Sequence, residues 1–152
     1  MSTLLEEFTS ITKALNEAGI DYAVCGGWAM AIHGAPRSTI DIDLLIRSED
    51  LGRIREIARE KGFDIEGLPL HFEIEIRRIS KVDSESNELI ILDLLLVSDE
   101  MQAFWIDRER IRWNAGETTV VSRKSLIEMK RLAGRTQDLA DIEKLLGGVD
   151  ES

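Results

Sequence analysis

The chain has 152 residues, of which 43% are hydrophobic, and it carries a formal net charge of −10 with a pI near 4.7. This length supports one buried core and is short for two, so we expect a single domain over residues 1–152. The surface should repel phosphate backbones, which disfavours broad nucleic-acid binding. The single cysteine, Cys25, excludes an intramolecular disulfide.

No apolar run approaches the ~20 residues that span a bilayer, the longest being residues 89–97. The first residues are acidic, where a secretory signal would carry a basic segment. We therefore expect a cytoplasmic protein without a membrane segment.

The N-terminal part predicts a helix, a strand and a second helix. Leu4, Leu5, Phe8, Ile11 and Leu15 recur at helical spacing, and a glycine follows as a stop. Residues 20–25 are then typical of a short buried strand. A glycine pair ends it, and residues 28–32 suggest a short helix. The order strand, glycine turn, helix is the first feature with a bearing on function.

The middle of the chain predicts two strands flanking a helix and then a hairpin. Residues 40–46 are expected to form a strand and residues 49–61 a helix. Apolar and charged residues alternate over 72–77, which indicates a half-exposed strand. A polar turn at 83–87 separates it from the apolar strand 89–97. Because that turn is too short for a crossover helix, these two strands should pair antiparallel.

The C-terminal part predicts mostly helices. A helix is expected to start at 98–100, a small edge strand at 118–121, and two C-terminal helices at 122–134 and 136–147. The expected fold class is therefore α+β, with a small mixed sheet flanked by helices.

Asp41 and Asp43 are the first candidate site residues. Side chains alternate along a strand, so both carboxylates should point the same way, about 6.6 Å apart at the α-carbons. Two carboxylates held so close repel each other unless a positive charge lies between them. Magnesium prefers oxygen ligands of this kind, so the pair predicts a metal site.

Asp93 is the candidate for a third carboxylate. It lies alone within a run of isoleucines and leucines, where an ionised group is costly unless it is paired or bound to metal. With it, two magnesium ions could clamp an in-line phosphoryl displacement. A plain salt bridge or a wet strand face would also explain Asp93, and Glu73 or Glu75 could take its place as the third ligand.

The glycine pair Gly26-Gly27 is the second candidate component, because a turn without β-carbons lets backbone amides approach a polyphosphate. By itself the pair is more typical of an ordinary tight turn. Trp28, which follows, could stack on a base or belong to the core.

Several of these residues occur in an order that resembles a known superfamily. The run in question is Gly26-Gly27-Trp28-Ala29, His33-Gly34, Arg37-Ser38-Thr39 and Asp41-Ile42-Asp43-Leu44-Leu45. It is similar to the DNA polymerase beta-like nucleotidyltransferases, which combine a glycine motif, an Asp-any-Asp strand and a lone acid on a later strand. The resemblance is closest to small bacterial proteins of the abortive-infection and toxin-antitoxin type, and more distant to antibiotic nucleotidyltransferases.

The C-terminal end also resembles this group, through Lys130, Gly134-Arg135, Asp138 and Asp141. One departure is Gly27, where many members have a serine.

The resemblance implies a role for each candidate residue. Gly26 and Gly27 would hold the triphosphate of a nucleoside triphosphate such as ATP, and Arg37 and Lys130 could neutralise its charge. Trp28 would lie beside the nucleotide. The three aspartates, Asp41, Asp43 and Asp93, would bind two Mg²⁺ ions, and the last would help to activate the acceptor hydroxyl.

The function expected from these features is metal-dependent transfer of a nucleoside monophosphate to a hydroxyl of a protein, a transfer RNA or a small molecule. A second hypothesis is a catalytically inactive module of the same fold that acts with a partner protein or as a homodimer. A third is an unrelated α/β domain or hydrolase whose aspartates do not converge.

Overall fold

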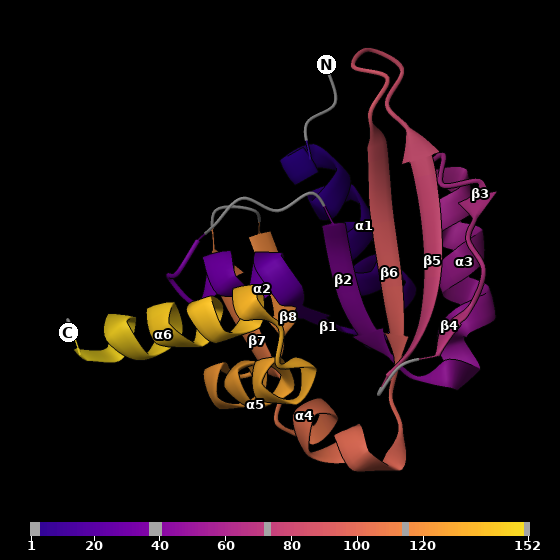
Figure 1. Cartoon of the computed structure of the whole chain (residues 1–152). Coiled ribbons are helices and arrows are strands. Elements are labelled where there is room, and N and C mark those ends of the chain that lie inside the picture. The colour runs from indigo at the N-terminus through magenta and orange to yellow at the C-terminus, as the bar shows by residue number, and fades with distance from the viewer. Residues whose placement is uncertain (1–3, 37–40, 72–73, 114–115, 151–152) are drawn as a thin grey trace.

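The computed structural model describes most of the chain, namely residues 4–36, 41–71, 74–113 and 116–150 (Figure 1). Its centre is a mixed eight-stranded sheet in the order β3-β5-β6-β2-β1-β8-β7, with β4 also paired to β5. The strands are β1 Ala23–Cys25, β2 Asp41–Ile46, β3 Ile65–Glu66, β4 Leu70–His71, β5 Glu75–Val82, β6 Leu89–Leu96, β7 Glu109–Trp113 and β8 Gly116–Val120.

The helices lie on both sides of this sheet. They are α1 Leu4–Ala18, α2 Gly26–Ile32, α3 Leu51–Glu60, α4 Gln102–Ile106, α5 Arg123–Ala133 and α6 Thr136–Asp150, with short 3₁₀ turns at Ser48–Asp50 and Asp99–Met101. Helices α1 and α3 lie behind the β2, β6 and β5 part of the sheet, and α5 packs against α6 and α4 (Figure 1). The fold is thus α+β, as predicted.

The core lies between the strands and their covering helices. Along β2 and β6, alternate residues Ile42, Leu44, Leu92 and Leu94 are completely buried, because their common face of the sheet is covered. The other face of the same two strands carries the aspartates. None of the helices in the described part of the chain is long and apolar enough to cross a membrane.

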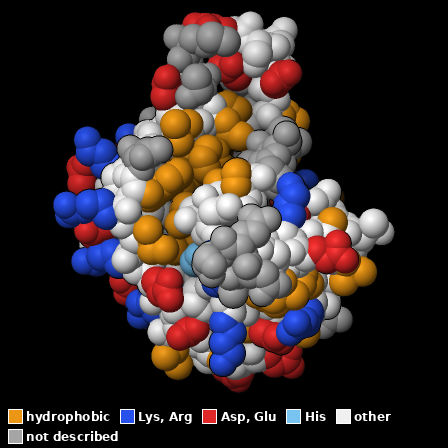
Figure 2. All heavy atoms as spheres, turned by 90° about the vertical axis from the view of Figure 1, so that its left-hand side faces the viewer, with side chains coloured by type: hydrophobic (Ala, Val, Ile, Leu, Met, Phe, Trp, Pro, Cys, Tyr) orange, Lys and Arg blue, Asp and Glu red, His pale blue; other side chains and the backbone are white. Residues whose placement is uncertain are grey.

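Surface charge is mixed rather than uniformly acidic on the face that Figure 2 shows. Acidic and basic side chains lie interspersed around its lower half, while hydrophobic side chains gather in its upper half.

Several predicted elements are confirmed. Helix α1 ends before Gly19, which adopts a positive φ of 68°. Strands β5 and β6 form the predicted antiparallel hairpin. Helix α5 begins after Ser122, whose hydroxyl accepts a hydrogen bond from the Ser125 amide, and it ends at the left-handed Gly134.

Other expectations need correction at the strand boundaries. The strand expected at 20–25 is only Ala23–Cys25. The strand expected at 72–77 begins at Glu75 and continues to Val82, whereas residues 72 and 73 lie outside the described part. Both shifts follow from hydrogen-bond partners on neighbouring strands, which local alternation does not reveal.

The C-terminal part also differs from the prediction. Strand β8 is not an edge strand, because it pairs with β1 on one side and with the unpredicted β7 on the other. Helix α6 continues to Asp150 beyond Gly147. Its first turn is stabilised by the Asp138 carboxylate, which accepts a hydrogen bond from the Arg135 amide, and not by Thr136 as a cap.

Candidate active site

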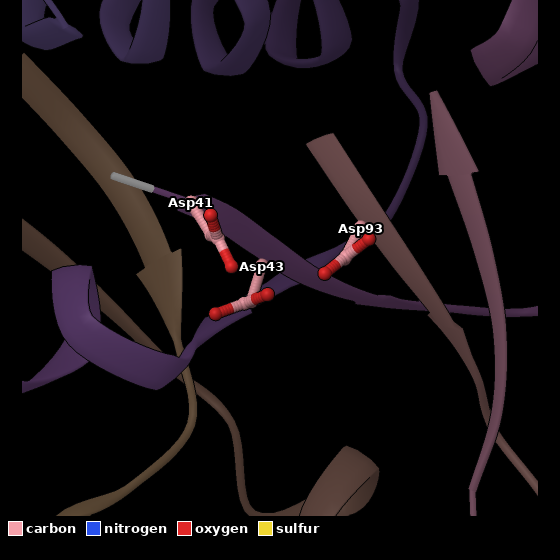
Figure 3. A group of neighbouring side chains, drawn as sticks. All are labelled: Asp41, Asp43 and Asp93. Atoms are coloured by element: carbon pink, nitrogen blue, oxygen red, sulfur yellow. The ribbon is translucent and has the colours of Figure 1, made fainter. Parts of the chain in front are cut away.

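The three predicted aspartates converge on one face of the sheet. Strands β2 and β6 are parallel neighbours, and their register places Asp43 directly beside Asp93. Asp41 lies two residues before Asp43, so it shares the same face. One ligand oxygen from each carboxylate lies within 4.8 Å of the others (Figure 3). The separation is one that a bound cation could bridge, and it contradicts the hypothesis of aspartates that do not converge.

Asp43 lies beside both Asp41 and Asp93, and its pKa is strongly raised. Burial, together with the neighbouring charges of Asp93 and Asp41, raises the pKa of Asp43 to about 7. The positive charges of Lys130 and Arg78 act in the opposite direction. A carboxylate that is costly to ionise in the free protein is a favourable ligand for a divalent cation, which removes that cost.

Gly26 makes room for the Asp43 carboxylate. This glycine begins α2 with a positive φ of 65°, and a β-carbon on it would lie 2.0 Å from Asp43 Oδ2. No side chain fits at that distance. Position 26 of the glycine turn must therefore lack a β-carbon if the Asp43 carboxylate is to keep its place on the neighbouring strand.

Asp93 is also paired with a base, Arg78 on β5. The Arg78 Nε and Nη2 atoms donate to the two oxygens of Asp93 at 2.8 and 3.0 Å. This contact raises the pKa of Arg78, and the charges of Asp41 and Asp43 act in the same direction. The salt bridge that was an alternative explanation for Asp93 is therefore present, and Asp93 also faces the other two carboxylates.

The alternative third ligands are not brought to the cluster. Glu75 lies on the face of β5 opposite to Arg78 and accepts a hydrogen bond from Arg77 at 2.8 Å. Glu73 lies outside the described residues. Within the described part of the chain, Asp41, Asp43 and Asp93 form the group of carboxylates close enough to share an ion.

The residues expected to contact the nucleotide occupy different places. Gly26 and Gly27 form the start of α2 beside Asp43. The Trp28 ring stacks on Phe8 with a centroid distance of 4.4 Å and is 9% exposed, which favours the core role over base stacking. Arg37 lies outside the described residues.

Lys130 is buried in an ion-pair network between α5 and α6. Its ammonium lies 2.8 Å from Asp141 Oδ2 and 3.6 Å from Asp138 Oδ1. Its charge nevertheless acts on Asp43, so it lies near the carboxylate cluster. The network joins the C-terminal helices close to the site, and Lys130 contributes to the local potential without losing its partners.

Arg78 is the site residue that sequence reasoning missed. It lies in an alternating stretch with several arginines, and only the register of β5 against β6 places it opposite Asp93. The one signal for it was the need of a buried carboxylate for a cation.

Comparison with known structures shows the same fold. The chain is similar to the antibiotic-resistance factor ANT(2'')-Ia in solution, with 18% identity over 98% of this chain and 86% of that one and a TM-score of 0.70. The crystal structure of ANT(2'')-Ia in complex with adenylyl-2''-tobramycin gives 16% identity, coverage of 95% and 88%, and a TM-score of 0.64. An antigenic nucleotidyltransferase-like protein from Paracoccidioides brasiliensis is 18% identical over 95% of this chain and 75% of that one, with a TM-score of 0.63.

Sequence comparison gives the family directly. No protein of curated function matches the sequence. A family model described as aminoglycoside-2''-adenylyltransferase matches residues 7–112, which include the glycine turn and all three aspartates. This match confirms the resemblance to the nucleotidyltransferase superfamily, and the closer likeness to toxin-antitoxin proteins stays a prediction. The chain belongs to the aminoglycoside-2''-adenylyltransferase family, whose reaction class is nucleotide transfer to a hydroxyl acceptor.

Proposed function

We propose that the protein transfers the adenylyl group of ATP to a hydroxyl of an aminoglycoside or a similar polycationic small molecule. The observation that carries this proposal is the convergence of Asp41, Asp43 and Asp93 within 4.8 Å beside the glycine turn. The name of the matching family supports the donor and the acceptor.

The three carboxylates fit a divalent metal. They supply hard oxygen ligands on one face, and the raised pKa of Asp43 indicates a cluster that is short of positive charge. We assign Asp41, Asp43 and Asp93 as ligands for up to two Mg²⁺ ions. Bound magnesium would stabilise the charge that develops on the attacking and leaving oxygens of the phosphoryl group.

The chain's own residues then have separate tasks. The backbone amides of the Gly26-Gly27 turn would hold the triphosphate, with Lys130 and Arg37 contributing positive potential. Asp93 would accept the proton of the acceptor hydroxyl as its oxygen forms a bond to the α-phosphorus. The bond from the α-phosphorus to the bridging oxygen breaks at the same centre, and pyrophosphate leaves.

The charge of the chain supports a cationic acceptor. A formal net charge of −10 attracts a polyamine-like molecule over distances of about a Debye length, roughly 10 Å at 0.1 M salt. The same charge opposes a transfer RNA acceptor. A protein hydroxyl is less favoured than a small polycation because the family match names the latter.

Calorimetric titration with ATP, GTP, CTP and UTP in the presence of Mg²⁺ tests the nucleotide site. We expect ATP to bind to the wild-type chain and the variant Asp41→Asn/Asp43→Asn to lose at least tenfold in affinity. A matched control is Asp64→Asn/Asp99→Asn, which removes the same charge at two exposed positions and should bind like the wild type. Equal losses in both double variants would contradict a specific metal site.

An inactive binding module of the same fold is the second candidate. In this candidate the domain would act together with a second copy or a partner protein. Magnesium-dependent ATP binding without any turnover on a panel of aminoglycosides would support this candidate.

A further inference from the structure

Arg78 lies on the strand beside Asp93. Among the described residues, it is the one that donates hydrogen bonds to both carboxylate oxygens of Asp93. Its side chain is 38% exposed, whereas that of Asp93 is 6% exposed. The two residues are paired in the register of β5 and β6, so the guanidinium reaches Asp93 along the sheet surface. A buried carboxylate is thus held by a base that itself extends toward solvent.

The geometry of this pair has a consequence for metal binding. A carboxylate offers about four lone-pair positions, so two hydrogen bonds from Arg78 leave room for a further ligand bond. The guanidinium charge nevertheless stays beside any cation that Asp93 binds. Because like charges repel, the guanidinium of Arg78 would weaken the binding of a cation by Asp93.

The net charge of the three aspartates also indicates that Arg78 acts as their counter-charge. Asp41, Asp43 and Asp93 together would carry −3 when ionised, and Arg78 reduces this to −2. Lys130 is close as well, but its charge is directly matched by Asp141 and Asp138. Arg78 is thus the cation that contacts the carboxylate cluster itself in the described structure.

We propose that Arg78 is a positioning residue that serves as the built-in counter-charge of Asp93. It holds the third carboxylate in place before any metal arrives, and it lowers the affinity of the free protein for divalent ions. This inference rests on the proposed metal site and goes beyond it, since it assigns a role to a residue outside the carboxylate set.

Binding of Mn²⁺ alone, followed by the loss of its free electron paramagnetic resonance signal at pH 8, tests this role without nucleotide or acceptor. The Coulomb energy between a unit charge and a divalent ion about 6 Å apart in water corresponds to roughly tenfold in affinity. We therefore expect Arg78→Gln to bind Mn²⁺ roughly tenfold more tightly than the wild type. Arg78→Lys, which keeps the charge, should stay within about twofold.

Arg77 provides a matched control on the same strand. It lies on the opposite face and pairs with Glu75, so Arg77→Gln removes the same charge away from the cluster. We expect its Mn²⁺ affinity to stay within about twofold of the wild type. Arg78→Met, which keeps the length of the side chain without its charge, is a second test if the glutamine variant does not fold.

The outcomes separate this inference from the proposed function. Weaker or unchanged Mn²⁺ binding in charge-removing variants at Arg78 whose circular dichroism matches that of the wild type would overturn the inference. An equal gain in Arg77→Gln would also overturn it, by showing a general charge effect. A wild-type chain that binds no Mn²⁺ would instead refute the metal site on which both rest.

Discussion

Replacing Asp43 by asparagine should stabilise the protein in the absence of metal. The pKa of this carboxyl rises from 3.8 to about 7 on folding, chiefly through burial and then through repulsion from Asp93 and Asp41. An acid with a raised pKa contributes stability that is fully present below the unfolded value, near pH 4. That contribution is lost as the pH rises through 7. Asparagine is uncharged throughout and avoids the loss.

The size of the effect follows from the same pKa values. A difference of 1.36 kcal/mol for each tenfold change in the ionisation constant gives an upper limit of about 4 kcal/mol at pH 8. Asp43 is partly exposed in the folded chain, and solvent screening reduces the effect. We therefore expect Asp43→Asn to unfold with a free energy about 1–3 kcal/mol higher than the wild type.

Urea unfolding followed by circular dichroism, at pH 5 and pH 8 in a chelator, measures this difference. The advantage of the asparagine variant should grow between the two pH values, and millimolar Mg²⁺ should stabilise the wild type but not the variant. Asp64→Asn, at an exposed carboxylate, is the control and should match the wild type both in its stability at the two pH values and in its stabilisation by Mg²⁺. An Asp43→Asn chain less stable than the wild type at pH 8 without metal would refute the reasoning.

Two further substitutions test the packing around the site. Gly26→Ala places a β-carbon 2.0 Å from Asp43 Oδ2. We therefore expect at least a tenfold loss of metal affinity and a stability loss of about 1–3 kcal/mol. The control Gly52→Ala, in open space on α3, should leave Mn²⁺ binding unchanged. Wild-type Mn²⁺ affinity in Gly26→Ala would contradict the requirement for a glycine beside the Asp43 carboxylate. Lys130→Met removes the ammonium that lies 2.8 Å from the buried Asp141 and should cost about 3–5 kcal/mol in urea unfolding, most of which Lys130→Met/Asp141→Leu should recover. If the double variant recovers nothing, the cost does not come from loss of this ion pair.

Local periodicity was sufficient for the elements whose pattern is set within the segment itself. Helix α1 and the β5–β6 hairpin could be predicted because an apolar stripe and a short polar turn determine them. Strand β7 could not, because its exposed, arginine-rich sequence forms a strand only through its pairing with β8. Its inward face carries only the half-buried Ile111 and Trp113, and two alternating apolar residues are too few to indicate a strand.

The site divides in the same way. The carboxylates could be recognised from their spacing and from the unusual position of Asp93 in an apolar strand. The roles of Gly26 and Arg78 depend instead on non-local geometry. Gly26 acts through the contact between the first residue of α2 and Asp43, and Arg78 through the register of β5 against β6. A glycine pair in a sequence indicates a turn, but which side chain fills the space it leaves is decided by the tertiary fold.

Transfer of label from α-phosphate-labelled ATP to tobramycin in the presence of Mg²⁺ tests the central claim most directly. The wild-type chain should form a labelled, cationic product together with pyrophosphate, and Asp93→Asn should lower the rate at least a hundredfold while still binding ATP. Equal product formation by the two chains would contradict the assignment of Asp93. ATP binding by the wild type without transfer to tobramycin or other aminoglycosides would contradict the proposed acceptor and favour a binding module.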